Sequence, residues 1–207
     1  PPYNIDPGLI QGWIMTDFLA ILFGACLVNN LVLHHLLAVA PAAALSRRID
    51  VAAGFGLAVS GIILVSTPLA WLLDHQVLQP QGLSHLRTLA FLILIAAVAA
   101  TALPVLARLK PLWHNHLAVY FPLALLNSGV LGAALLGTTG VHGFGAALAF
   151  ALGTGAGYTL ICVLFAGLQE RVQTADVPAA FQGVPLQLLI FAILSMAFMG
   201  FAGLGGS

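Results

Sequence analysis

Two polar pairs interrupt membrane-length apolar stretches, and they are the residues best placed to do chemistry. The pairs are Asn29-Asn30 and Asn127-Ser128, each near the start of one half of the chain. An unsatisfied amide in hydrocarbon costs several kcal/mol, so such residues must face protein, water or a cofactor. Helices that break at mid-membrane are one way to build an ion site. Buried amides also hydrogen-bond between helices, for about 0.6 to 2 kcal/mol each, and this alternative stays open.

Two adjacent histidines, His34 and His35, follow the first pair within the same apolar stretch. Neighbouring side chains project about 100° apart on a helix, so both can face one metal only where the helix unwinds. A histidine near a helix end is commonly an interfacial residue, and in a membrane it can also relay protons or bind a metal. Both residues are therefore candidates for a polar relay.

The remaining candidate residues favour packing over chemistry. Cys26 and Cys162 lie in apolar runs, where inert buried thiols explain them better than a disulfide or a metal pair. The spacing of Gly153 and Gly157 indicates close helix packing rather than a phosphate cradle, because no Walker lysine follows. No Lys, Arg, Asp or Glu lies at the centre of an apolar stretch, which argues against proton pumping on buried carboxylates within this chain alone.

Composition places these residues in a membrane protein. Hydrophobic residues make up 61% of the chain and charged residues only 6%, and the mean hydropathy is +1.07. Soluble domains carry about 25% charged residues, so this chain cannot cover itself with a hydrated surface. Its formal net charge is zero, with six basic and six acidic residues, and a nucleic-acid partner is therefore not supported.

Six apolar segments are present, and their continuous rather than alternating runs predict helices instead of barrel strands. The segments cover about residues 13–45, 51–73, 86–106, 117–136, 144–167 and 184–204. The first is too long for one straight crossing and, like the fourth, contains a polar pair and a proline. We therefore predict an all-α polytopic membrane protein of six transmembrane helices, with the first and fourth broken.

The basic residues predict an orientation and a repeat. The loops after the first, third and fifth segments hold Arg47, Arg48, Arg108, Lys110 and Arg171, whereas the opposite side holds only Arg87. By the positive-inside rule the first set is cytoplasmic and both termini lie outside. Three crossings per half then give a 3+3 inverted repeat with halves of about 15–107 and 108–207, in which Asn29-Asn30 and Asn127-Ser128 become symmetry mates.

A series of short motifs runs in order along the chain. It comprises Met15-Thr16-Asp17-Phe18, Leu27-Val28-Asn29-Asn30, Leu86-Arg87-Thr88, Val130-Leu131-Gly132, Ala134-Leu135-Leu136, Gly143-Phe144-Gly145-Ala146, Leu164-Phe165-Ala166-Gly167, Glu170-Arg171, Asp176-Val177-Pro178 and Met196-Ala197-Phe198-Met199-Gly200-Phe201. This series is similar to the RnfA family from Met15 onward. The resemblance predicts an N-terminal extension over 1–14 and a single RnfA-like membrane domain over 15–207.

The resemblance implies partners and a function. In the family, RnfA is a six-helix subunit that pairs with its inverted paralogue RnfE, as NqrE pairs with NqrD. The complexes couple electron transfer to Na⁺ or H⁺ translocation, and half-helices of both paralogues supply cysteines to a mid-membrane iron–sulfur cluster. We therefore expect a subunit, non-catalytic alone, of an Rnf/Nqr-like translocase in the inner membrane. Iron–sulfur and flavin cofactors are then expected in the partner subunits.

The chain departs from the family at both positions that carry cluster ligands. The family's Leu-Gly-Leu-Cys-Pro corresponds to a segment ending in Ala40-Pro41, and its Thr-Thr-Asn-Cys to one ending in Ser128. Alanine cannot coordinate iron, and a serine hydroxyl is a poor substitute for a thiolate. We expect this chain to ligate no metal in the family's way. The mid-membrane site is then expected to consist of Asn29, Asn30, Ala40, Pro41, Asn127, Ser128 and Gly129.

Two other functions stay open from the sequence. A stand-alone inverted-repeat transporter of ions or solutes, with no redox role, fits the missing cysteines, because unwound backbone at broken helices can hold an ion. A weaker hypothesis is that His34 and Ser128 replace the cysteines as ligands for a different metal. Flavin-bearing partners would favour the electron-transport complex, whereas flux by the chain alone would favour the transporter.

Overall fold

The computed structural model describes residues 18–37, 48–109, 127–140, 143–173, 177–178 and 181–201, and every regular element in these ranges is helical. Within these ranges three helices are long and apolar enough to cross a membrane, and three shorter apolar helices accompany them. The all-α prediction is confirmed. The elements are η1 (Gly24–Val28), α3 (Ile49–Leu73), η2 (Asp74–Leu78), η3 (Ser84–Leu86), α4 (Arg87–Leu109), α7 (Ser128–Thr139), α8 (Phe144–Gln173) and α9 (Val184–Met199).

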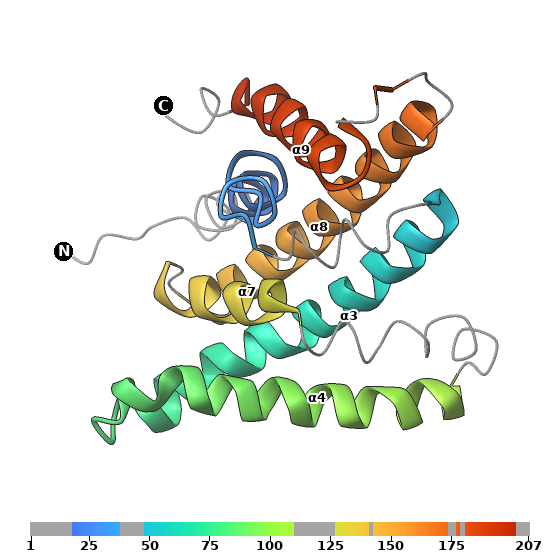
Figure 1. Ribbon diagram of the computed structural model, residues 1–207. Coiled ribbons are helices and arrows are strands. Elements are labelled where there is room, and N and C mark those ends of the chain that lie inside the picture. Colours follow the sequence, from blue (N-terminus) through green and yellow to red (C-terminus); the bar gives the residue numbers. More distant parts are fainter. Residues whose placement is uncertain are drawn as a thin grey trace.

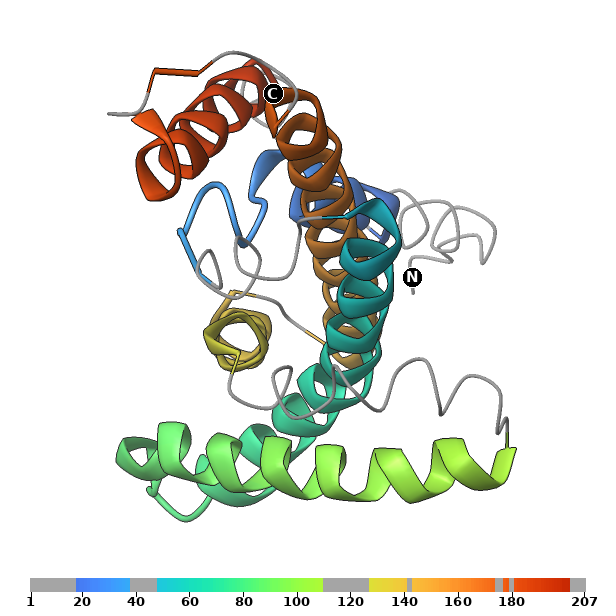
Figure 2. The ribbon, with the colours of Figure 1, turned by 45° about the vertical axis from the view of Figure 1, so that its right-hand side comes forward.

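The helices α3 and α8 form the central pair of the structure and run antiparallel (Figures 1 and 2). Their contacts pair residues in opposite order along the chain. At one end the Ile49 backbone N–H donates to Glu170 Oε1 at 3.1 Å. Nearer the middle the Ser60 hydroxyl donates to the Gly155 carbonyl at 2.6 Å and lies 2.8 Å from the Thr159 hydroxyl. Small side chains at this crossing let the two backbones approach closely.

The other helices pack on α3 and α8 in a pattern that repeats between the two halves of the chain. The first helix (Phe18–Val28) packs on α8 as α7 packs on α3, and α9 contacts α8 as α4 contacts α3. In addition, α9 touches the first helix and α4 touches α7. These contacts support the inverted repeat. The complete six-helix repeat stays a prediction, because ranges 38–47 and 110–126 lie outside the described residues.

The first helix approaches α8 at two glycines. A Cβ atom on Gly157 would lie 2.7 Å from the Cys26 carbonyl oxygen and 2.8 Å from Asn30 Nδ2. A Cβ on Gly153 would overlap the Leu22 carbonyl. The interpretation of this spacing as a close helix contact is confirmed, and the contact brings the first helix against the middle of α8.

A buried ion pair closes the hairpin between α3 and α4. Asp74 has no exposed surface, and its two carboxylate oxygens accept from Arg87 Nε at 2.7 Å and Nη2 at 2.9 Å. Gln79 Nε2 adds a third hydrogen bond at 2.7 Å. The sequence analysis placed Arg87 at the start of the third apolar segment, on the side opposite the other basic residues, but did not identify this partner.

Candidate functional site

The first helix ends in a widened turn at the first polar pair. Residues Gly24–Val28 form a π-helical turn, and the Asn29 backbone N–H donates to the Gly24 carbonyl at 2.7 Å. The chain is then non-helical over residues 29–37, which we call the first break. Single π-helical turns are frequently found at functional sites.

The Asn30 side chain satisfies the backbone on both sides of the first break. It is 1% exposed, and its amide nitrogen donates to the Cys26 carbonyl at 2.8 Å. Its amide oxygen accepts from the backbone N–H groups of Val32 at 3.0 Å and Leu33 at 3.4 Å. One neutral side chain therefore replaces the helical hydrogen bonds lost at the break, where hydrocarbon cannot supply partners.

The second polar pair marks the start of α7, whose first residue is Ser128, and we call this helix start the second break. Asn127 is 3% exposed and caps the helix, because its amide oxygen accepts from the Gly129 backbone N–H at 2.9 Å. Its amide nitrogen donates to the Tyr158 hydroxyl on α8 at 2.9 Å. The predicted fourth segment thus contains a helix start at its polar pair, while residues 117–126 lie outside the described part of the chain.

The two breaks meet on the same turn of α8. The Asn30 amide lies beside Gly157, and the Asn127 amide bonds to the next residue, Tyr158. Both amide oxygens accept a backbone N–H two residues further along. The structural counterpart of Asn127 is therefore Asn30 and not Asn29, which shifts the pairing read from the sequence by one residue.

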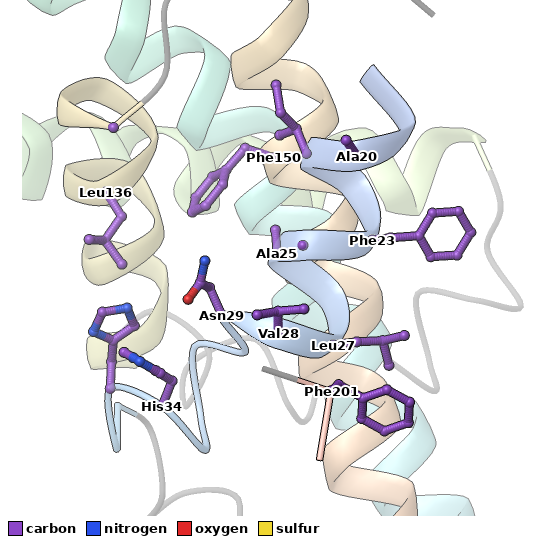
Figure 3. A pocket seen from close by; sticks show the side chains of 14 residues that line it. Ala20, Phe23, Ala25, Leu27, Val28, Asn29, His34, Leu136, Phe150 and Phe201 are labelled. Carbon is purple, nitrogen blue, oxygen red and sulfur yellow. The ribbon is translucent and has the colours of Figure 1, made fainter. Parts of the chain in front are cut away.

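Asn29 and the His pair (His34 and His35) face a cavity of about 990 Å³ beside the first break (Figure 3). All three side chains are exposed, in contrast to the buried Asn30. The imidazole centroids are 4.8 Å apart, with the ring planes at 64°. The unwinding that the sequence required for two adjacent histidines to share one site is therefore present.

The cavity walls are otherwise apolar. In Figure 3 the first helix supplies one wall, and Leu136 of α7 lies toward His34. The lining residues are Ala20, Ile21, Phe23, Gly24, Ala25, Leu27, Val28, Asn29, His34, His35, Leu136, Gly140, Phe150 and Phe201. An apolar cavity with a few polar groups on one side is the usual form of a binding site.

The iron–sulfur ligation of the RnfA family does not fit the residues described. Ser128 is an exposed residue at the start of α7, and Ala40 and Pro41 lie outside the described residues. The two cysteines lie at other positions of the sequence: Cys26 is half-buried in the π-helical turn that precedes the first break, and Cys162 is buried in α8, one turn after Tyr158. Over the described ranges no group of three or more His, Cys, Asp or Glu side chains gathers. Among the described residues, the breaks themselves carry the amides of Asn29, Asn30 and Asn127, the Ser128 hydroxyl and the imidazoles of His34 and His35.

Sequence reasoning missed two residues that fix the breaks. Tyr158 receives the Asn127 amide, and Ser195 of α9 donates from its hydroxyl to the Leu33 carbonyl at 3.3 Å. The signal for Tyr158 was available, since a phenol inside an apolar helix needs a hydrogen-bond partner. No comparable signal marks Ser195, because a serine can bond within its own helix.

Comparisons with known proteins match nearly the whole chain. A family model described as "Rnf-Nqr subunit, membrane protein" matches residues 18–205. The proteins named as the A component of the ion-translocating oxidoreductase complex from Syntrophotalea carbinolica and Vibrio cholerae are 40% and 36% identical to this chain. Each alignment covers 92% of this chain and 98% of the relative. The counterpart from Thioalkalivibrio sulfidiphilus is 40% identical, covering 92% of this chain and 99% of that protein.

Proposed function

The chain belongs to the Rnf-Nqr family of membrane subunits, and we propose that it is an integral membrane subunit of a complex that couples electron transfer to Na⁺ or H⁺ translocation. The observation that carries this function is the full-length similarity to proteins named as the A component of an ion-translocating oxidoreductase complex. The apolar helices agree with it. A stand-alone transporter has weaker support, because these relatives are named as subunits of a complex.

The two breaks are the part of this chain suited to that role. Asn30 and Asn127 open the backbone of two segments without introducing charge, and both do so against α8. Asn29 and the His pair then supply polar groups to a cavity inside an otherwise apolar molecule. Such groups can hold or pass an ion at mid-membrane, where unwound backbone is tolerated only if it lines a cavity or protein.

The electron carriers belong to the partner subunits in this proposal. Ser128 stands at one ligand position of the family and Ala40 at the other, so we propose that this chain does not ligate an iron–sulfur cluster in the usual way. The flavin and iron–sulfur groups are then held elsewhere in the complex. An RnfE-like or NqrD-like inverted paralogue is the proposed neighbour.

We further propose an inner-membrane location with both termini outside. The basic residues support this orientation, because Arg48 precedes α3 and Arg171 is near the end of α8, and these two helix ends lie together through the Ile49–Glu170 hydrogen bond. Arg87 lies at the opposite end of α3, bound to Asp74. The side richer in basic residues is therefore cytoplasmic by the positive-inside rule.

Copurification tests the proposed function. The full chain, carrying a histidine-free tag, is extracted from its native membrane in a mild detergent, and the partners are identified by mass spectrometry and absorption. We expect subunits that carry flavin and iron–sulfur groups. A chain that purifies alone from native membranes, and conducts ions or a solute in vesicles without an electron donor, contradicts the proposal and favours the transporter.

A further inference from the structure

The His pair is held in a conformation that a regular helix cannot provide. Both imidazoles reach the same cavity because the chain is unwound over residues 31–35. Figure 3 shows Asn29 at the end of the first helix and His34 toward Leu136 of α7, on the same cavity. Three side chains with nitrogen or oxygen donors therefore share one space.

The separation of the two rings matches that of two ligands on one metal ion. Imidazole nitrogens bind zinc at about 2.0–2.1 Å, which places the centroids of two rings on one tetrahedral or octahedral ion about 5 Å apart. The observed centroid separation between His34 and His35 is 4.8 Å. The rings meet edge-on at 64° and are not stacked face to face.

The backbone that carries the His pair is fixed on its N-terminal side. The His34 backbone N–H donates to the Asn30 carbonyl at 2.8 Å, while the Asn30 amide oxygen accepts from two further N–H groups of the turn. Ser195 holds the Leu33 carbonyl from α9. A metal site gains affinity when its ligands are positioned before the ion arrives.

The residue after the His pair is strained. Leu36 has φ +53°, and among the described residues it is the non-glycine residue with a positive φ. This left-handed conformation costs about 1–2 kcal/mol for a branched side chain. Leu36 is also 67% exposed, so burial of its side chain does not offset the cost. The surrounding hydrogen bonds from Asn30 and Ser195 must therefore hold the turn in this conformation against its cost.

We propose that His34 and His35, with the Asn29 amide oxygen as a third donor, bind one divalent transition-metal ion of the zinc–copper class. Imidazole is a preferred ligand for these ions, and the cavity of about 990 Å³ leaves coordination positions for water or an anion. The site differs from the sequence hypothesis of His34 with Ser128, because the structure pairs His34 with His35. It does not depend on the proposed electron-transport role.

Metal binding to the purified full chain tests this site. The protein, with a histidine-free tag, is treated with a chelator and then titrated with Zn²⁺ and with Cu²⁺. We expect one equivalent bound per chain, and a Cu²⁺ electron paramagnetic resonance spectrum with hyperfine coupling to two imidazole nitrogens. His34→Ala and His35→Ala should each weaken binding by about tenfold or more and remove one nitrogen coupling.

His85→Ala is the matched control, because His85 is also exposed but lies in η3, on the α3–α4 hairpin. It should bind metal as the unaltered chain does. Equal loss in this variant, or unchanged binding in both His34→Ala and His35→Ala, identifies adventitious binding and overturns the proposal.

A second measurement needs no variant. Diethyl pyrocarbonate acylates accessible imidazoles, and mass spectrometry reports each site in the unaltered chain. Bound Zn²⁺ should protect His34 and His35 together while His85 reacts as before. Absence of protection at one equivalent of Zn²⁺ contradicts the site even if the histidine variants fail to fold. Copurification of the complex reports separately on the proposed function.

Discussion

Two regions of the molecule bury polar side chains in an apolar fold, and they do so by opposite means. At the α3–α4 hairpin, Asp74 and Arg87 form a charge pair with both carboxylate oxygens bonded. At the two breaks, Asn30 and Asn127 use neutral amides that bond to nearby backbone and to Tyr158. Both regions satisfy groups that hydrocarbon cannot satisfy.

The two regions differ in whether their polar side chains are exposed to a cavity. Around Asp74 both carboxylate oxygens accept hydrogen bonds from neighbouring side chains, and this buried cluster holds the end of α3 to the start of α4. Beside the first break, Asn29 and the His pair are exposed to a cavity next to a strained residue. In a purely structural polar cluster the polar groups bond to one another, whereas a binding site presents hydrogen-bond donors and acceptors to a cavity. The contrast supports assigning function to the break.

The largest effect should come from breaking the charge pair. Arg87→Met leaves the Asp74 carboxylate buried with only Gln79 as a side-chain partner, and removing one member of a buried pair costs about 3–5 kcal/mol. We expect a marked loss of folded protein, measured as the free energy of unfolding in mixed micelles. The double variant Asp74→Asn/Arg87→Met removes both charges and should recover most of the loss. No recovery would contradict the charge account.

The next effect tests the buried amide of the first break. Asn30→Leu leaves the Cys26 carbonyl and two backbone N–H groups without their partner, and each orphaned buried group costs about 1–3 kcal/mol. We expect a loss of about 2–4 kcal/mol in the same unfolding measurement. Asn29→Leu is the control, since Asn29 is exposed and should change stability little. Equal losses in the two variants would refute the assignment of Asn30 as the residue that holds the break.

A smaller loss of stability should follow from adding a methyl group where the first helix packs closely against α8. Gly157→Ala places a methyl group 2.7 Å from the Cys26 carbonyl and 2.8 Å from the Asn30 amide, and such overpacking costs about 1–3 kcal/mol. The thermal midpoint should fall. Gly167→Ala, on the same helix with open space around it, should leave the midpoint unchanged or raise it slightly. A neutral Gly157→Ala variant would mean that the two helices do not meet there.

The smallest loss in the free energy of unfolding is expected at the second break. Tyr158→Phe removes the hydroxyl that accepts from Asn127, while the helix cap formed by the Asn127 amide oxygen remains. We expect a loss of about 1 kcal/mol in the free energy of unfolding. Asn127→Leu removes both interactions and should cost more than Tyr158→Phe. The reverse order would contradict the capping role of Asn127.

Much of the fold could be predicted from the apolar runs. The segments predicted over 51–73 and 184–204 correspond to α3 (Ile49–Leu73) and the start of α9 at Val184. The sequence also predicted breaks at both polar pairs, because an amide pair in hydrocarbon must find partners. The structure shows the first helix ending at the first pair and α7 starting at Ser128, while residues 110–126 lie outside its described part. The 3+3 repeat remains a prediction that the matched packing supports.

The details of the site could not be predicted, because they depend on contacts between distant parts of the chain. Which of Asn29 and Asn30 is buried is set by the close approach of α8 at Gly157. That His34 and His35 both face one cavity depends on unwinding of the chain, which their adjacency in the sequence does not predict. The Asp74–Arg87 pair depends on the turn of a hairpin whose length the apolar pattern leaves undefined.

A density map of the complete complex in a lipid nanodisc tests the central claim most directly. We expect the first helix to end at Asn29 and α7 to begin at Ser128, with both breaks against residues 157–158 of α8 and no sulfide bound by this chain. Unbroken helices through both positions, or an iron–sulfur cluster held by side chains of this chain, would contradict the claim.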